Sequence, residues 1–277
     1  MTYSQQMNDF INLRRFFNPV QPRFKEGGDG VIYSELAPAS SLSGFVCCYW
    51  HLASTKSFAG PFVYTVVADG CIDFFFDLND PREYFVMGFS SAHASFPLQK
   101  DFNYVGVRFF PGAFPALFNI EASLLTNQCY FISEVVPKVS EKLKSLLTRS
   151  SNFEQIKVSF DHYFRENILA GDVNFDRRFA QSLAAVLRSG GSLNVERDVA
   201  STVSPRHLRR LFDFYIGGSP KEFSKIVRFQ KFLNGTQSRH ALRNEKSYYT
   251  MGYYDQSHFI KDFKQFYGAA PLKAFAT

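Results

Sequence analysis

Ser204-Pro-Arg-His-Leu-Arg-Arg-Leu-Phe212 and Asp255-Gln-Ser-His-Phe-Ile-Lys-Asp-Phe263 follow one pattern, and the second lies 51 residues after the first. Both copies continue to a glycine and a proline at the same offset, Gly217 and Pro220 in the first and Gly268 and Pro271 in the second. Ser204 and Asp255 are good helix N-caps, and each glycine lies where a helix ends in a left-handed residue. The pattern therefore predicts a repeated, capped helix.

Each predicted helix has an apolar face and a polar face. Leu208 and Phe212 lie four residues apart, as do Phe259 and Phe263, and this spacing puts each pair on one side of its helix. The opposite sides carry Arg206, Arg209, Arg210 and Asp213 in the first copy, and Ser257, Ile260, Lys261 and Lys264 in the second. A repeated short helix of this kind is what a helix-turn-helix module presents to a DNA major groove.

The basic charge of the chain lies in its C-terminal part. Residues 171–277 hold 17 Lys and Arg against nine Asp and Glu, whereas residues 1–170 hold 14 against 16. Such an asymmetry predicts a polyanionic partner for one domain and a different role for the other. With 277 residues and 45% hydrophobic content, the chain is long enough for two domains.

The cysteines and the hydropathy pattern bound the environment of the protein. Cys47, Cys48, Cys71 and Cys129 form no CxxC pair and have no histidine at a ligand spacing, so we expect no structural metal, and buried thiols in a reducing compartment. No run of about 18 apolar residues is present, and we expect a cytoplasmic protein with no membrane partner.

The N-terminal half predicts β structure. Residues 1 to about 30 are polar and end in Glu26-Gly-Gly-Asp-Gly30, which indicates a mobile lead-in. Short β-rich runs follow, bounded by turn residues, at 45–52, 61–68, 71–78, 84–89 and 104–110. Asp69-Gly70 between two of these runs is typical of a hairpin. These features predict an antiparallel barrel or sandwich.

Helical periodicity takes over after Pro115. Amphipathic helices are predicted at 135–147 and 153–166, where they would join two domains or pair two subunits. Beyond a seam at 170–172, further helices are predicted at 175–188, 195–201, 205–216, 220–234, 240–250, 256–267 and from 271. The predicted fold class is α+β. Its domains are a β-rich sensor or dimerisation domain (1–135), a helical connector (136–170) and an all-α domain (171–277).

The C-terminal motifs resemble a known family. The two copies, together with Gly218-Ser-Pro-Lys-Glu-Phe223, Arg228-Phe-Gln230 and Phe266-Tyr-Gly268, resemble the DNA-binding domain of AraC/XylS transcription regulators over about the last 100 residues. The resemblance implies two helix-turn-helix units joined by one long helix. Val67-Ala-Asp-Gly-Cys-Ile-Asp-Phe-Phe-Phe76 and Gly106-Val-Arg-Phe-Phe-Pro-Gly112 are similar to motifs of a cupin-like domain at the front of some such regulators.

Residue roles follow from the resemblance position by position. Its base-facing positions fall on Arg206, Arg209 and Arg210 in the first unit and on Gln256, Ser257 and Lys261 in the second. His207, His258 and Lys264 would contact phosphates, although the two histidines have the alternative of capping or packing locally. Arg228 would make either an internal ion pair or a phosphate contact. Ile260 would meet a thymine methyl or mark a partly buried face.

Two departures from the family pattern support an alternative function. Val199-Ala-Ser-Thr-Val203 lacks the expected glycine, and Tyr248 and Tyr249 stand where small or aliphatic residues are usual. Two bulky rings need extra room between supporting and reading helices. The alternative is a degenerate AraC-like protein that acts mainly through protein contacts and binds DNA weakly.

No catalytic constellation stands out, and we expect no enzyme and no cofactor. Asp73 and Asp77 lie four residues apart on a predicted strand, or about 13 Å, which is too far for a carboxylate dyad. Phenylalanine occurs 33 times, which favours an aromatic ligand pocket with Trp50, Tyr64, Asp73 and Arg108 as candidate lining residues. The candidate partners are double-stranded DNA, a small-molecule effector, RNA polymerase and a second copy of the chain.

Overall fold

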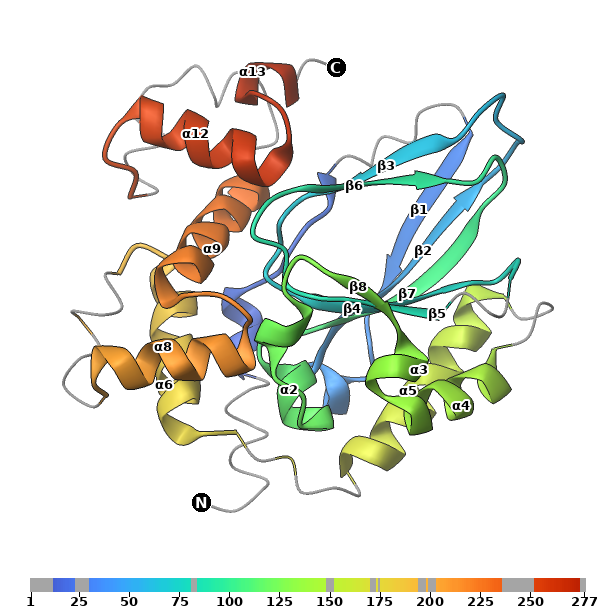
Figure 1. The fold of residues 1–277 in the computed structure, drawn as a ribbon, viewed down its shortest axis with the longest axis horizontal. Helices are drawn as coiled ribbons and strands as arrows, with labels where there is room; N and C mark the ends of the chain where they lie inside the picture. Colours follow the sequence, from blue (N-terminus) through green and yellow to red (C-terminus); the bar gives the residue numbers. More distant parts are fainter. Residues whose placement is uncertain are drawn as a thin grey trace.

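The protein has a β-rich N-terminal part followed by a helical C-terminal part (Figure 1). The computed structural model describes residues 12–22, 30–80, 84–147, 152–169, 173, 175–193, 198, 203–235 and 252–274. In the view of Figure 1 the strands lie to the right, and the helices from residue 177 onward lie to the left. This is the α+β arrangement that the sequence predicts.

The strands form two antiparallel sheets. The larger has the order β1-β2-β7-β4-β5-β8, and β3 and β6 pair separately. The strands are β1 (Val31–Leu36), β2 (Val46–Ser54), β3 (Phe62–Val66), β4 (Ile72–Asp77), β5 (Tyr84–Met87), β6 (Ala94–Leu98), β7 (Asn103–Phe109) and β8 (Cys129–Phe131). All five predicted runs are strands. On β4, Phe74 and Phe76 point into the main core, and Asp73 and Phe75 point to the other face, as a period of two requires.

The predicted hairpin at Asp69-Gly70 is wrong. β3 pairs with β6, whereas β4 pairs with β5 and β7, so the two runs belong to different sheets. The turn itself exists, because Asp69 Oδ1 accepts the amide of Cys71 and Gly70 has φ +74°. The main chain of Ala68 is instead bonded to the C-terminal helices, donating to Phe266 O. The sequence therefore predicts the turn correctly, but tertiary contacts determine which strands pair.

The predicted mobile lead-in is also wrong for residues 12–22; the rest of it lies outside the described residues. A short 3-10 helix, η1 (Arg14–Phe16), is flanked by the buried side chains of Leu13 and Phe17. The ring of Phe17 contacts Phe110 of the β-rich part and Phe223 of the C-terminal part. This segment is ordered because it packs between the two parts of the molecule.

Two further sets of helices complete the fold. Helices α2 (Ala113–Phe118), η4 (Ala122–Leu125), α3 (Ile132–Val135), α4 (Pro137–Leu146) and α5 (Phe153–Leu169) follow or flank the large sheet. The C-terminal part contains α6 (Arg177–Ser189), α8 (Pro205–Tyr215), α9 (Pro220–Gly235), α12 (Gln256–Tyr267) and α13 (Pro271–Ala274). The predicted helix at 240–250, including Tyr248 and Tyr249, and the predicted helix at 195–201, except residue 198, lie outside the described residues.

The repeated helices begin and end as their sequences predict. Ser204 Oγ accepts the amide of His207 at 3.4 Å, and Asp255 Oδ1 accepts the amide of His258 at 2.8 Å. The following glycines, Gly217 and Gly268, both have a positive φ. The four apolar residues of the pattern are at most 5% exposed: Leu208, Phe212, Phe259 and Phe263.

Candidate DNA-reading helices and the intersheet cavity

The two repeated helices, α8 and α12, lie at opposite ends of α9 (Figure 1). Their polar sides face solvent, and the exposed candidates are Arg206, Arg209, Arg210, Gln256, Ser257, His258, Lys261 and Lys264. Ser219 caps α9 by accepting the amide of Glu222 at 3.2 Å. The cationic and amide groups of both helices are therefore available to a partner.

His207 differs from the other candidates. Its side chain is half-buried, and its Nδ1 lies 3.0 Å from Nη2 of Arg210. His207 therefore packs locally on its own helix, which was one of the two roles considered for it. The contact also orients the guanidinium of Arg210, one of the residues that the resemblance places against bases.

Arg228 makes hydrogen bonds within the protein. Its Nη1 donates to Gly252 O at 2.9 Å, its Nη2 donates to Gly191 O at 2.7 Å, and its guanidinium lies over the ring of Tyr253. Neither predicted role, ion pair or phosphate contact, describes these bonds to carbonyl groups. Ile260 on α12 is half-buried against the core, which matches the partly buried alternative.

Both repeated helices are held at their C-terminal ends by the β-rich part. After α8, Gly217 O accepts from Thr126 Oγ1 at 2.6 Å. After α12, Gly268 lies against the ring of His93, so that an added Cβ would come within 2.7 Å of it. These glycines occupy equivalent positions of the repeat. The candidate base contacts lie in the N-terminal halves of the two helices, away from these anchors, and are exposed.

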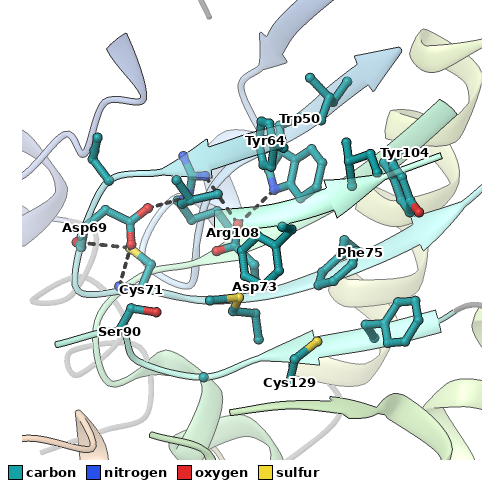
Figure 2. A pocket seen from close by; sticks show the side chains of 18 of the residues that line it. Trp50, Tyr64, Asp69, Cys71, Asp73, Phe75, Ser90, Tyr104, Arg108 and Cys129 are labelled. Carbon is teal, nitrogen blue, oxygen red and sulfur yellow. Dashed lines mark hydrogen bonds and ion pairs between the residues drawn. The ribbon is translucent and has the colours of Figure 1, made fainter. Parts of the chain in front are cut away.

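A cavity of about 350 Å³ lies between the two sheets, and we call it the intersheet cavity. Side chains from β2 to β8 line it, and they include all four candidate ligand residues, Trp50, Tyr64, Asp73 and Arg108. Figure 2 shows Asp69, Cys71 and Ser90 at one end and the rings of Phe75 and Tyr104 at the other. The cavity therefore has a polar end and an aromatic end.

Arg108 organises the polar end from the centre of β7. Only 2% of its side chain is exposed, and three carboxylates surround it. Its Nε lies 3.0 Å from Asp69 Oδ2, its Nη2 lies 3.3 Å from Asp73 Oδ2, and its Nη1 lies 3.4 Å from Glu35 Oε1. Burying one guanidinium without such partners would be costly, because desolvation strongly disfavours an unpaired charge.

Burial shifts the ionisation of the groups at this end. Burial raises the pKa of Asp73 to about 7, against the attraction of Arg108, and the nearby charge of Asp69 adds to the rise. Burial also opposes the charge of Arg108, but Asp73 and Asp69 outweigh it and hold the pKa of Arg108 above its ordinary value. The thiol pKa of Cys71 is raised by burial, so this thiol is protonated.

The sequence predicts an aromatic pocket but does not identify Asp69, Phe75 and Tyr104 as lining residues or Glu35 as a partner of Arg108. Asp69 was assigned to a hairpin turn, which hid its contact with Arg108. Phe75 follows Asp73 at the period of a strand, and this signal would have placed its ring on the same face. The pairing of Asp73 with Arg108 is a register between β4 and β7, two strands that are not neighbours in sequence.

Other expectations concern metals, thiols and membranes. Within the described residues no group of three or more His, Cys, Asp and Glu side chains is placed to hold a metal ion. Cys47, Cys48 and Cys71 are buried as predicted, but Cys129 on the edge strand β8 is exposed, which corrects that prediction. No helix in the described part of the chain combines the length and apolarity needed to cross a membrane.

Two family models match separate parts of the chain. Residues 34–131 match a family described as a domain of unknown function (DUF6597), and residues 200–276 match a family described as a helix-turn-helix domain. No curated protein matches.

Solved structures of ToxT from Vibrio cholerae are similar over most of the chain. An apo form of a ToxT variant from strain SCE256 is 12% identical, with 91% of this chain and 98% of that chain covered and a TM-score of 0.39. Wild-type ToxT from the same strain, bound to an unsaturated fatty acid, is 14% identical, with 90% and 96% covered and a TM-score of 0.41.

Proposed function

We propose that this chain, which carries a C-terminal helix-turn-helix domain of the AraC type, is a sequence-specific DNA-binding transcription regulator whose intersheet cavity binds an effector. One observation carries the proposal. Two equivalent helices, each with an N-cap side chain that accepts the amide three residues later, present exposed cationic and amide side chains at the two ends of one largely buried helix, α9. This arrangement suits a protein that reads two segments of one duplex.

The dimensions and chemistry of the helices support base reading. α9 has 16 residues and is about 24 Å long, so helices at its two ends approach the separation of successive major-groove segments, about 34 Å. Arg209 and Arg210 suit guanine, and Gln256 suits adenine. Each good bidentate contact contributes about 1 to 3 kcal/mol of discrimination between bases.

The segment between β3 and β4 supports effector control, because it touches the cavity and the C-terminal helices alternately. Val67, Asp69 and Cys71 line the cavity. Between them, Ala68 donates to Phe266 O of α12 at 3.0 Å and accepts from Gln230 Nε2 of α9 at 2.8 Å. A ligand that moves Val67, Asp69 or Cys71 would therefore also shift the bonds of Ala68 to α9 and α12.

The segment after β5 makes a second connection of the same kind. Gly88 and Ser90 line the cavity, and Phe89 between them packs on Gly218, at the turn that follows α8. Further along, Ser91 O accepts from Gln265 Nε2 of α12 at 2.8 Å. Both DNA-reading helices thus contact chain segments that form the cavity wall, which supports a shift in their placement when an effector binds.

Selection of bound fragments from genomic DNA with the purified chain tests the proposal. We expect fragments with a shared motif whose affinity falls linearly on a log–log plot against salt, because several cationic contacts release counterions. Recovery of no common motif, with a flat salt response at measurable affinity, would favour the degenerate, protein-contacting alternative. Adding RNA polymerase to the same binding assay tests that partner, and varying the protein concentration tests whether a second copy of the chain takes part.

A further inference from the structure

The polar end of the intersheet cavity holds more negative than positive groups. Two carboxylates, Asp69 and Asp73, line this end beside the single guanidinium of Arg108, and no other Lys or Arg lines the cavity within the described residues. Glu35 pairs with the same guanidinium but is not part of the lining. The other ionisable lining groups are phenols and thiols, at Tyr64, Tyr104, Cys71 and Cys129. Arg108 therefore neutralises at most one of the two lining carboxylates, and Glu35 shares the same positive charge, so the site favours a ligand that adds positive charge.

Asp73 is the carboxylate that a ligand reaches most directly. Both contacts that fix it, from Trp50 Nε1 at 2.9 Å and from Arg108 Nη2 at 3.3 Å, go to Oδ2. Its second oxygen, Oδ1, is therefore the acceptor that remains for a ligand. Asp69 is more fully engaged, because Gln21 Nε2 and the amide of Cys71 donate to its two oxygens.

The remaining walls are aromatic and apolar. The centroid of the Phe75 ring lies 6.3 Å from that of Trp50, 6.1 Å from that of Tyr104 and 5.1 Å from that of Phe85. These rings begin where the polar end stops (Figure 2). Aromatic faces attract cations through their quadrupole and also bury the apolar part of a ligand.

We propose that the intersheet cavity binds a small organic cation, with its positive group at Asp73 and its aromatic or alkyl body against Phe75 and Tyr104. This inference rests on the proposed role of the cavity as the effector site. It assigns the chemical class of that effector: an amine or quaternary ammonium compound with an apolar body, small enough for a cavity of about 350 Å³.

The ionisation of Asp73 supports the assignment. Burial raises the pKa of this carboxyl to about 7, so near neutral pH the carboxyl is protonated part of the time. A bound ammonium group would take the place of that proton. The ionisable groups that surround Asp73 are Arg108, Asp69, Glu35, Cys48 and Tyr64.

The only tryptophan of the chain, Trp50, lines the cavity and gives a direct signal of binding. Its fluorescence is followed while the full chain is titrated with phenethylamine, benzyltrimethylammonium, phenethyl alcohol or hydrocinnamate, which share an aromatic body and differ in charge. We expect one or both cations to bind at least about tenfold more tightly than the alcohol, and the carboxylate to bind most weakly.

A substitution at Asp73 separates charge recognition from simple burial of the ring. Asp73→Asn keeps the shape of the side chain, and calorimetry should show affinity for the preferred cation falling about tenfold while affinity for the alcohol is unchanged. Asp101→Asn is the matched control, because it removes an exposed carboxylate outside the cavity, and it should change neither affinity. Thermal unfolding of each variant confirms that it is folded.

Other outcomes would overturn the inference. Tightest binding of hydrocinnamate would assign an anionic effector, and no binding of any probe to the folded chain would remove the organic cation altogether. Equal loss of cation and alcohol affinity in Asp73→Asn would show that the carboxylate only shapes the cavity. DNA binding of the same preparation is measured separately, so that failure of the cation inference is distinguished from failure of the regulator proposal.

Discussion

Gly106 on β7 allows Trp50 to lie flat against the strand beside it. A Cβ at position 106 would approach the Trp50 ring to 2.2 Å, and Trp50 pairs with Gly106 across β2 and β7. The absence of a side chain at this one position therefore sets where the indole lies, and with it the hydrogen bond from Trp50 to Asp73. The glycine shapes the cavity without lining it.

Gly106→Ala should displace Trp50 and weaken its bond to Asp73. We expect a shifted tryptophan emission spectrum and a loss of about 1 to 3 kcal/mol in the free energy of unfolding, because the added methyl group overpacks a filled site. Gly60→Ala is the control, since a Cβ there meets nothing within 4 Å. An unchanged spectrum with full stability in Gly106→Ala would contradict this account of the packing.

Asp73 also predicts how stability depends on pH. Its pKa of about 7 in the folded chain exceeds the ordinary value of about 3.9 in the unfolded chain, so between these values the folded state holds a proton that the unfolded state has lost. Its contribution to stability is therefore complete below about pH 4 and is lost as the pH rises through about 7.

Urea unfolding at several pH values checks this prediction. Relative to Asp73→Asn, the free energy of unfolding of the wild-type chain should fall by up to about 1 kcal/mol per pH unit between about pH 5 and 7. Arg108 pairs with this carboxyl and also with Asp69 and Glu35, and these three residues are unchanged in both proteins. Parallel stability curves for the two proteins would show that Asp73 does not titrate in this range.

At the scale of elements, the reading faces of α8 and α12 can be tested without disturbing their buried faces. Arg210 and Lys261 are exposed, whereas the apolar residues on the opposite sides of the two helices are buried. Arg210→Ala and Lys261→Ala should each weaken binding to the selected DNA by about tenfold or more, because a bidentate base contact is worth about 1 to 3 kcal/mol.

Gel-shift titrations with specific and unrelated DNA measure this effect. Lys142→Ala removes one positive charge from the exposed face of α4, away from both helices, and should leave specific affinity unchanged. If unrelated DNA loses as much affinity as the specific site, the two residues contact phosphates rather than bases. Full operator affinity in both variants would remove them from the reading faces.

The strands show why some elements are harder to predict than others. β6 contains Pro97, which removes a hydrogen-bond donor and argues against a strand, yet the two-stranded sheet leaves edges where proline is tolerated. β1 is an edge strand of the large sheet with no fully buried residue, so its sequence alternates weakly. Three of the predicted strands, β2, β4 and β7, are adjacent in the large sheet and consist mostly of buried apolar residues, which makes their patterns easy to detect.

At the scale of the whole molecule, Gln230 connects the two parts. It is fully buried on α9, where its Nε2 donates to Ala68 O and its Oε1 accepts the amide of Val20 at 2.8 Å. One side chain thereby joins the N-terminal segment, the cavity wall and α9, the helix between α8 and α12. Buried polar groups that are satisfied in this way fix one arrangement of the parts around them.

Gln230→Leu should uncouple the cavity from DNA binding. The variant keeps the apolar volume of α9 but leaves Ala68 O and the amide of Val20 without their partner, at a cost of about 1 to 3 kcal/mol in the free energy of unfolding. We expect effector affinity to be retained while the change in DNA affinity upon effector binding is lost. Lys221→Gln, an exposed change on the same helix, is the control. A full effector response in Gln230→Leu would place the coupling elsewhere.

The sequence by itself determined the repeated helices and their caps, the apolar faces they bury and the strands of the sheet core. Capping and periodicity act over a few residues, so a local pattern specifies them. The four residues that the sequence offers as candidates for a pocket, Trp50, Tyr64, Asp73 and Arg108, all line the intersheet cavity. Their grouping around Arg108 was not predicted.

Only the tertiary structure decided how these pieces are joined. It paired β3 with β6 although the turn after β3 looks like a hairpin to β4, buried Gln21 and Gln230 between the two parts, and brought Asp69 to Arg108. Each of these contacts links residues far apart in the chain, and their energies depend on burial and on partners that no local pattern contains. The contacts that join the cavity wall to α9 and α12 therefore arise only in the folded molecule.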